Sequence, residues 1–237
     1  IPLLSNFSAD VSYIKLKTPK NIIIKVIRDI QISQDHIFIH EGLSEKVMVF
    51  DLSGNFIKQI GSQGRGPNEY INLRSFFVAK NNKDVFLYTG NSGNILKFNS
   101  NGEFVKKLFA FHYADYMYCI DTTFLFSGLW TDTRNMPGNI FQFTTTNTTG
   151  RILDSVPLPL YSIKNFREKA LSFPGNFPST KFNQCLLLYG LGEATIYYSS
   201  REGIIKSRYY LDFGKYYIQL EKRYVNLRIY NREASIV

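Results

Sequence analysis

The chain has 237 residues, of which 44% are hydrophobic and 16% aromatic, so it can bury a substantial core and lacks the composition of a disordered protein. Its 28 Lys and Arg residues against 19 Asp and Glu residues give a formal net charge of +9. The basic residues are scattered, with no run of five or more, which favours a solvated outer face over a nucleic-acid-binding surface. No apolar run is long enough for a transmembrane helix.

A turn motif recurs at a fixed spacing along the chain. Its glycines are Gly54, Gly102 and Gly150, so each step is 48 residues, and a weaker copy ends at Gly203. Short stretches of period-two alternation surround these turns and predict strands. In chain order the predicted strands are 28–33, 36–41, 46–51, 55–60, 74–80, 84–88, 94–98, 103–109, 115–120, 123–127, 139–144, 150–156, 184–189, 193–198 and 203–211.

Four antiparallel strands in each repeat of this length are typical of a β-propeller blade. We therefore predict an all-β fold, a single β-propeller domain over residues 1–237. The expected blades are about 28–60, 74–109, 115–156 and 166–213, with flanking strands at 10–27 and 214–237.

Three stretches resemble one known family: Val-Phe-Asp-Leu-Ser-Gly-Asn-Phe at 49–56, Gly-Ser-Gln-Gly-Arg-Gly-Pro-Asn-Glu-Tyr at 61–70, and Tyr-Tyr-Leu-Asp-Phe-Gly at 209–214. The chain is similar to the six-bladed, NHL-like β-propellers of Bacteroidetes. The resemblance implies an exported protein, periplasmic or at the cell surface and often a lipoprotein, and it transfers no catalytic residue.

Six such repeats need more residues than the chain has, so we expect a ring that is incomplete or truncated relative to six blades, or a smaller ring. A strand at 11–16 is expected to complete the last blade. An open flank would expose strand edges, which predicts self-association through them.

The long loops of a meander blade emerge at one end, and that end is the predicted binding face. One loop, 61–73, holds Arg65, Glu69 and Tyr70. Arg65 offers a planar fork to a carboxylate or to sugar hydroxyls. The alternative is a structural loop in which these residues tie neighbouring blades together.

A second loop, 128–138, contains Trp130 with Asp132 and Arg134 nearby. An aromatic ring beside polar groups suits carbohydrate, and the alternative is a ring that packs the loop onto its blade. His40 precedes Glu41 near the same end and is a candidate ligand-binding residue. It could also serve as a general base, but no partner nucleophile stands at a recognisable spacing.

Residues typical of metal and cofactor sites are not clustered. Cys119 and Cys185 show no C-x-x-C spacing, and the three histidines are dispersed, so we expect neither metal nor disulfide. The glycine-rich stretches 90–93 and 190–192 lack the Lys-Ser/Thr of a phosphate loop and are interpreted as hairpin turns, so no cofactor is expected.

These observations favour a non-catalytic binding module that presents its loops to a glycan, peptide or protein. One alternative is a lyase or hydrolase acting in the central channel. The predicted inner strands 28–33, 74–80 and 115–120 offer few acid–base groups, which counts against it. A structural component of an envelope assembly is a further alternative.

Overall fold

The computed structural model describes residues 12–66, 68–79, 83–90, 92–111, 114–131, 140–157, 179–182, 185–189 and 195–210. All regular secondary structure in these ranges is β-strand, as predicted. The strands are β1 (Ile27–Ile32), β2 (His36–Glu41), β3 (Lys46–Asp51), β4 (Phe56–Ile60), β5 (Ser62–Gln63), β6 (Glu69–Tyr70), β7 (Leu73–Val78), β8 (Val85–Thr89), β9 (Asn94–Phe98), β10 (Phe104–Ala110), β11 (Tyr116–Ile120), β12 (Thr123–Thr131), β13 (Ile140–Thr146), β14 (Ile152–Pro157), β15 (Ser179–Phe182), β16 (Cys185–Tyr189), β17 (Thr195–Ser199) and β18 (Ile205–Tyr210).

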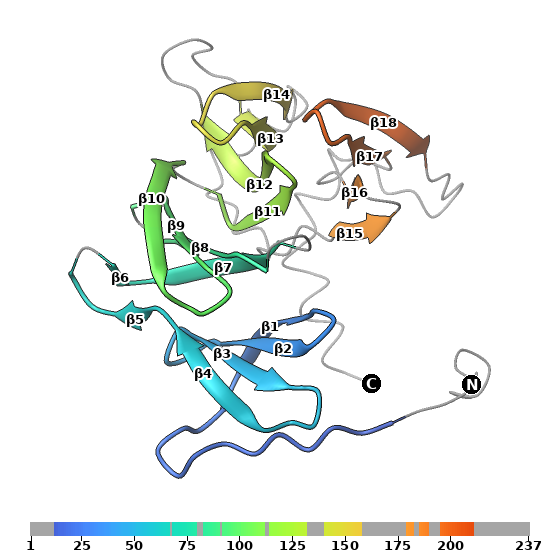
Figure 1. Cartoon of the computed structure of the whole chain (residues 1–237). Helices are drawn as coiled ribbons and strands as arrows, with labels where there is room; N and C mark the ends of the chain where they lie inside the picture. The colour runs from blue at the N-terminus through green and yellow to red at the C-terminus, as the bar shows by residue number, and fades with distance from the viewer. Residues whose placement is uncertain are drawn as a thin grey trace, which may run out of the picture.

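Within these ranges the strands form four antiparallel meanders of four strands each: β1 to β4, β7 to β10, β11 to β14 and β15 to β18. We call them blades 1 to 4, because successive four-stranded meanders are the units of a β-propeller. Figure 1 shows the blades following one another in an arc, with first strands toward its middle and last strands outside. The predicted fold class is therefore confirmed.

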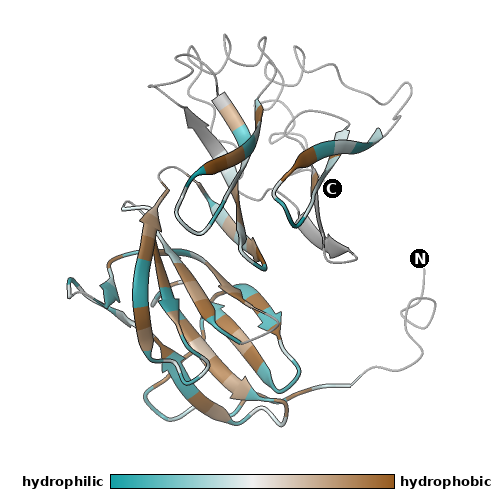
Figure 2. Ribbon diagram, turned by 45° about the horizontal axis from the view of Figure 1, so that its top comes forward, coloured by the Kyte–Doolittle hydropathy of each residue, from teal (hydrophilic) through white to brown (hydrophobic). Residues whose placement is uncertain are grey.

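The blades pack face to face through their apolar side chains. Successive side chains of a strand point to opposite faces, so each blade contributes to two cores; Figure 2 shows hydrophobic and hydrophilic residues alternating along the strands. The core between blades 1 and 2 includes Phe38, Val47, Val49, Phe76, Val85 and Leu87. The core between blades 2 and 3 includes Phe77, Phe86, Tyr88, Met117, Phe124 and Phe126.

The segment before β1 lies along blade 1. We expected a strand at 11–16, but Val11 lies outside the described residues and 12–16 form no strand. Lys17 instead makes an isolated parallel bridge with Asn55, and its N–H donates to the carbonyl of Gly54 at 2.7 Å. The prediction for 12–16 is therefore wrong.

Burial explains this course of the chain. Leu16, Ile22 and Ile24 pack against an apolar face of blade 1 that consists of Ile37, Ile39, Met48 and Phe50. All four of those residues are buried, so the segment removes from water a face that no described blade covers.

The first and last residues of the repeated turn explain why it forms. In the turn after β3, the side chain of Asp51 accepts hydrogen bonds from the N–H groups of Ser53 and Asn55, at 2.9 and 2.8 Å. Asn99 and Asn147 accept the corresponding bonds in blades 2 and 3. The turn glycines have φ of +80° at Gly54 and Gly102, a conformation that side chains with a Cβ rarely adopt.

We expect Gly54→Ala to destabilise the protein more than Gly102→Ala. Both substitutions cost about 1–2 kcal/mol from the left-handed backbone. A Cβ on Gly54 would in addition overlap the backbone carbonyl of Lys15, whereas one on Gly102 meets the movable end of the Ile60 side chain at 2.9 Å. Urea unfolding of the two variants tests this, and equal losses would show that 12–17 does not dock here.

Candidate functional site

The inner strands of blades 1 to 3 all begin at the same end of the blades, which we call the loop end. In β1 the register shifts between Ile27 and Asp29, and in β7 between Leu73 and Ser75. The extra residues of these two irregularities are Arg28 and Arg74. A β-bulge re-aims the side chain of its extra residue, so both arginines stand apart from the regular alternation.

Blade 3 places an acidic residue at the matching position. Asp115 immediately precedes β11, and its N–H donates to the carbonyl of Ser127 at 2.9 Å. The next residue, Tyr116, pairs with Ser127 in the sheet, as Ser75 pairs with Tyr88 in blade 2. Asp115 thus occupies in blade 3 the place that the two arginines occupy in their own blades.

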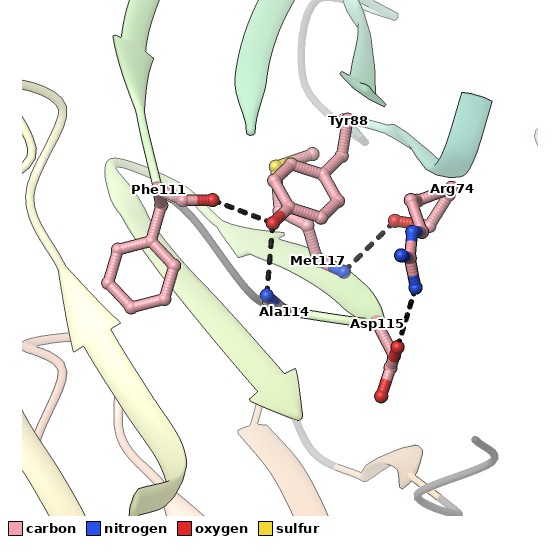
Figure 3. Close-up of polar contacts among 7 residues, drawn as sticks. Arg74, Tyr88, Phe111, Ala114, Asp115 and Met117 are labelled. Carbon is pink, nitrogen blue, oxygen red and sulfur yellow. Dashed lines mark hydrogen bonds and ion pairs between the residues drawn. The ribbon is translucent and has the colours of Figure 1, made fainter. Parts of the chain in front are cut away.

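An ion pair connects two of these positions across the junction of blades 2 and 3. Nη1 of Arg74 donates to Oδ1 of Asp115 at 2.8 Å, with side-chain exposures of 43% and 34% (Figure 3). Burial raises the pKa of the Asp115 carboxyl, and Arg74 opposes that rise. The pair is accessible from solvent.

Tyr116 and Asp29 belong to the same electrostatic group. Burial raises the pKa of Tyr116, the carboxylates of Asp115 and Asp29 raise it further, and Arg28 opposes them. Tyr116 is half-buried and stays protonated at neutral pH. We call Arg28, Asp29, Arg74, Asp115 and Tyr116 the mouth cluster.

The sequence interpretation missed the mouth cluster. It considered only histidine and carboxylate side chains on the predicted inner strands and found few of them. The signal was nevertheless present, because Arg28, Arg74 and Asp115 are the first residues of the three predicted inner strands. Only the register of the sheets shows that these three residues occupy the same position in their respective blades.

Tyr88 holds the chain that leads into the mouth cluster. Its hydroxyl donates to the carbonyl of Phe111 at 2.6 Å and accepts from the N–H of Ala114 at 3.1 Å (Figure 3). Burial raises the pKa of Tyr88 to about 12. A second tie lies beside it, because the N–H of Met117 donates to Oγ of Ser75 at 3.0 Å. Together they fix the start of β11 against blade 2.

His40 occupies in blade 1 the sheet position that Tyr88 occupies in blade 2, because it pairs with Asp29 as Tyr88 pairs with Ser75. It is 1% exposed, lies edge-on to the ring of Phe76 and leaves its Nε2 without a described hydrogen-bond partner. Burial, assisted by Arg28, lowers its pKa to about 4. It does not line an open site in the described part of the chain.

Glu41 is a structural carboxylate. Its oxygens accept from the N–H and hydroxyl of Ser44, at 2.6 and 2.5 Å, and from the N–H of Val26 at 3.0 Å. Burial alone would raise its pKa, but these hydrogen bonds lower it to about 2. Glu41 therefore joins the chain before β1 to the end of β2.

The loop with Arg65, Glu69 and Tyr70 is tied within itself and to the core at two of these residues. A carboxylate oxygen of Glu69 accepts from the N–H of Gly66 at 2.7 Å, and Tyr70 is buried between blades 1 and 2 with no described partner for its hydroxyl. Burial raises the pKa of Tyr70. Arg65 is exposed. These three residues are not described in contact with the mouth cluster, and their ligand-binding role stays a prediction.

The second predicted loop begins later than expected. β12 continues to Thr131, and Trp130 pairs with Phe141 of β13, so the backbone of Trp130 belongs to a strand. Asp132 and Arg134 lie outside the described residues. The proposed contact of Trp130 with a sugar is untested.

The described residues include neither a metal-ligand cluster nor a membrane-spanning helix. They contain no group of three or more His, Cys, Asp or Glu residues arranged to hold a metal ion. None of their elements is a helix of the length and hydrophobicity needed to span a membrane.

A family model described as "Domain of unknown function (DUF4934)" matches residues 2–235. The chain belongs to this family. No curated protein matches it. This membership accounts for nearly the whole sequence.

Solved structures support the propeller fold. A Bacteroides fragilis protein named as a candidate exported protein aligns with a TM-score of 0.68 and 21% identity, covering 86% of this chain and 55% of its own. A Bacteroides vulgatus member of the duf4221 family aligns with a TM-score of 0.51 and 11% identity, covering 81% and 59%.

Catalytically inactive virginiamycin B lyase from Staphylococcus aureus, solved with quinupristin, aligns with a TM-score of 0.50 and 14% identity, covering 85% of this chain and 60% of its own. The chain therefore spans less than two thirds of each of these three proteins. At these identities the likeness establishes the fold.

Proposed function

We propose that this protein is a non-catalytic binding module that captures its ligand at the loop end, on the mouth cluster. The observation that supports this proposal is that ionisable side chains stand at equivalent positions, at the starts of the inner strands, in three successive blades. Arg28 and Asp29 come from blade 1, Arg74 from blade 2, and Asp115 and Tyr116 from blade 3. Polar groups that a rigid scaffold directs to one place are typical of a binding site.

Acid–base catalysis in the channel, the alternative function, receives less support. The inner strands β1, β7, β11 and β15 contain no histidine in the described structure. Within the mouth cluster Asp115 is ion-paired and Tyr116 stays protonated, so neither is a ready general base. The likeness to a lyase concerns the fold.

We also propose an extracytoplasmic location. The likeness to the candidate exported protein of Bacteroides fragilis supports it. Attachment through a lipid and self-association through blade edges are further proposals, which cell fractionation and light scattering would test. Exposed Ile30 and Ile32 on β1 are consistent with the second of them.

A binding screen tests the proposed function. The protein is passed over one library of immobilised oligosaccharides and one of peptides. We expect wild type to bind members of at least one library, and Arg74→Gln to weaken that binding about tenfold or more, because hydrogen bonds to charged groups are worth about 1.5–3 kcal/mol.

Two further variants make the screen specific to the site. Asp121→Asn removes an ion pair to Arg201, 3.6 Å long, which joins blades 3 and 4 at the opposite end, and it should leave binding unchanged. Trp130→Ala tests the end of β12 separately. Binding that survives Arg74→Gln, or no binding in either library, would contradict the proposal.

A further inference from the structure

We infer that the ligand of the mouth cluster is a neutral polyhydroxylated molecule, a glycan or polyol that offers two neighbouring hydroxyl groups to Arg74 and Asp115. This inference rests on the proposed function and adds the chemical class of the ligand. Three properties of the mouth cluster support it: its charge balance, the form of its ion pair and its phenol.

The first property is charge balance. The chain as a whole carries a formal charge of +9, but the mouth cluster combines two arginines with two aspartates, so its formal charge is zero. A phosphate or other anion attracted by Arg28 and Arg74 would also be repelled by Asp29 and Asp115. A cation attracted by the two aspartates would be repelled by the two arginines. A neutral ligand avoids both repulsions.

The second property is the geometry of the ion pair. The bond from Arg74 to Asp115 uses one of the five N–H groups of a guanidinium and one of the two carboxylate oxygens. With 43% and 34% of the two side chains exposed, donors and an acceptor lie side by side at the surface. One ligand hydroxyl can donate to the carboxylate while its neighbour accepts from the guanidinium, and both bonds are charge-assisted.

The third property is the protonation state of Tyr116. Burial and two nearby carboxylates raise its pKa, so the phenol carries its proton throughout the neutral range. A protonated phenol suits a sugar hydroxyl without a change of charge, and an aromatic ring suits the apolar face of a sugar.

Calorimetric titration of the full chain tests the ligand class. Cellohexaose, xylohexaose and mannohexaose are the neutral probes, and oligogalacturonate and chitosan oligomers are the acidic and basic ones. We expect one of the neutral probes to bind, with an affinity that changes less than about twofold between low and high salt, because screening acts on charged partners.

Two variants test whether the ligand binds at the Arg74–Asp115 ion pair. Arg74→Gln and Asp115→Asn should each weaken the neutral probe about tenfold or more. Both also loosen a junction between blades, so the matched control is Asp121→Asn. That change removes the ion pair to Arg201 that joins blades 3 and 4 at the opposite end, and it should leave the affinity unchanged.

The outcomes separate the two proposals. Binding of a charged probe or of a peptide alone, weakened by Arg74→Gln, would overturn the ligand class and leave the proposed site intact. Binding that neither Arg74→Gln nor Asp115→Asn weakens would overturn both.

Discussion

Tyr88→Phe is expected to lower the free energy of unfolding by roughly 2–6 kcal/mol, because the lost hydroxyl takes a hydrogen-bond partner from two buried backbone groups, at about 1–3 kcal/mol each. These groups are the carbonyl of Phe111 and the N–H of Ala114, at 2.6 and 3.1 Å from the hydroxyl oxygen. The substitution preserves the ring, so it changes the packing of the core little. Urea unfolding at neutral pH measures the loss.

Tyr13→Phe is the matched control. It makes the same chemical change on a side chain that is 92% exposed, and it should leave stability unchanged within about 0.5 kcal/mol. A loss below about 1 kcal/mol in Tyr88→Phe would show that water or a shift of the chain satisfies the two groups. In that case Tyr88 would not be the main tie between blades 2 and 3.

We expect the protein to lose stability in mild acid through His40. Burial lowers its pKa from 6.5 to about 4, so the unfolded chain takes up a proton at a higher pH than the folded protein does. The stability that neutral His40 contributes is therefore fully present above pH 6.5 and is lost as the pH falls toward 4. The shift corresponds to roughly 3 kcal/mol at full loss.

His40→Phe removes this titration and keeps a ring beside Phe76. Between pH 7 and 4.5 the variant should lose about 2–3 kcal/mol less than wild type, measured by urea unfolding at each pH. His36→Gln is the control and should retain the acid-dependent loss. Most of the loss from Glu41, whose pKa is about 2, comes below pH 4.5, outside this window. Equal losses in wild type and His40→Phe would contradict the assignment to His40.

Local patterns in the sequence determined the blades. Period-two alternation located the strands, and the Asp/Asn-x-x-Gly turns located the hairpins, because a side-chain acceptor at the first position and a left-handed glycine at the last are local requirements. The turn glycines at 54, 102, 150 and 203 all have positive φ, as their role requires. Neighbouring residues contain all of this information.

Contacts between distant segments decided the rest. The sequence could not show that 12–17 would dock on blade 1, because its alternation alone does not reveal which face it covers. It also could not show that Arg28, Arg74 and Asp115 are equivalent. Bulges and sheet register place them, and register depends on pairing with the next strand. The candidate site therefore emerged from tertiary structure, since its members lie 41 residues apart even at the closest pair between blades.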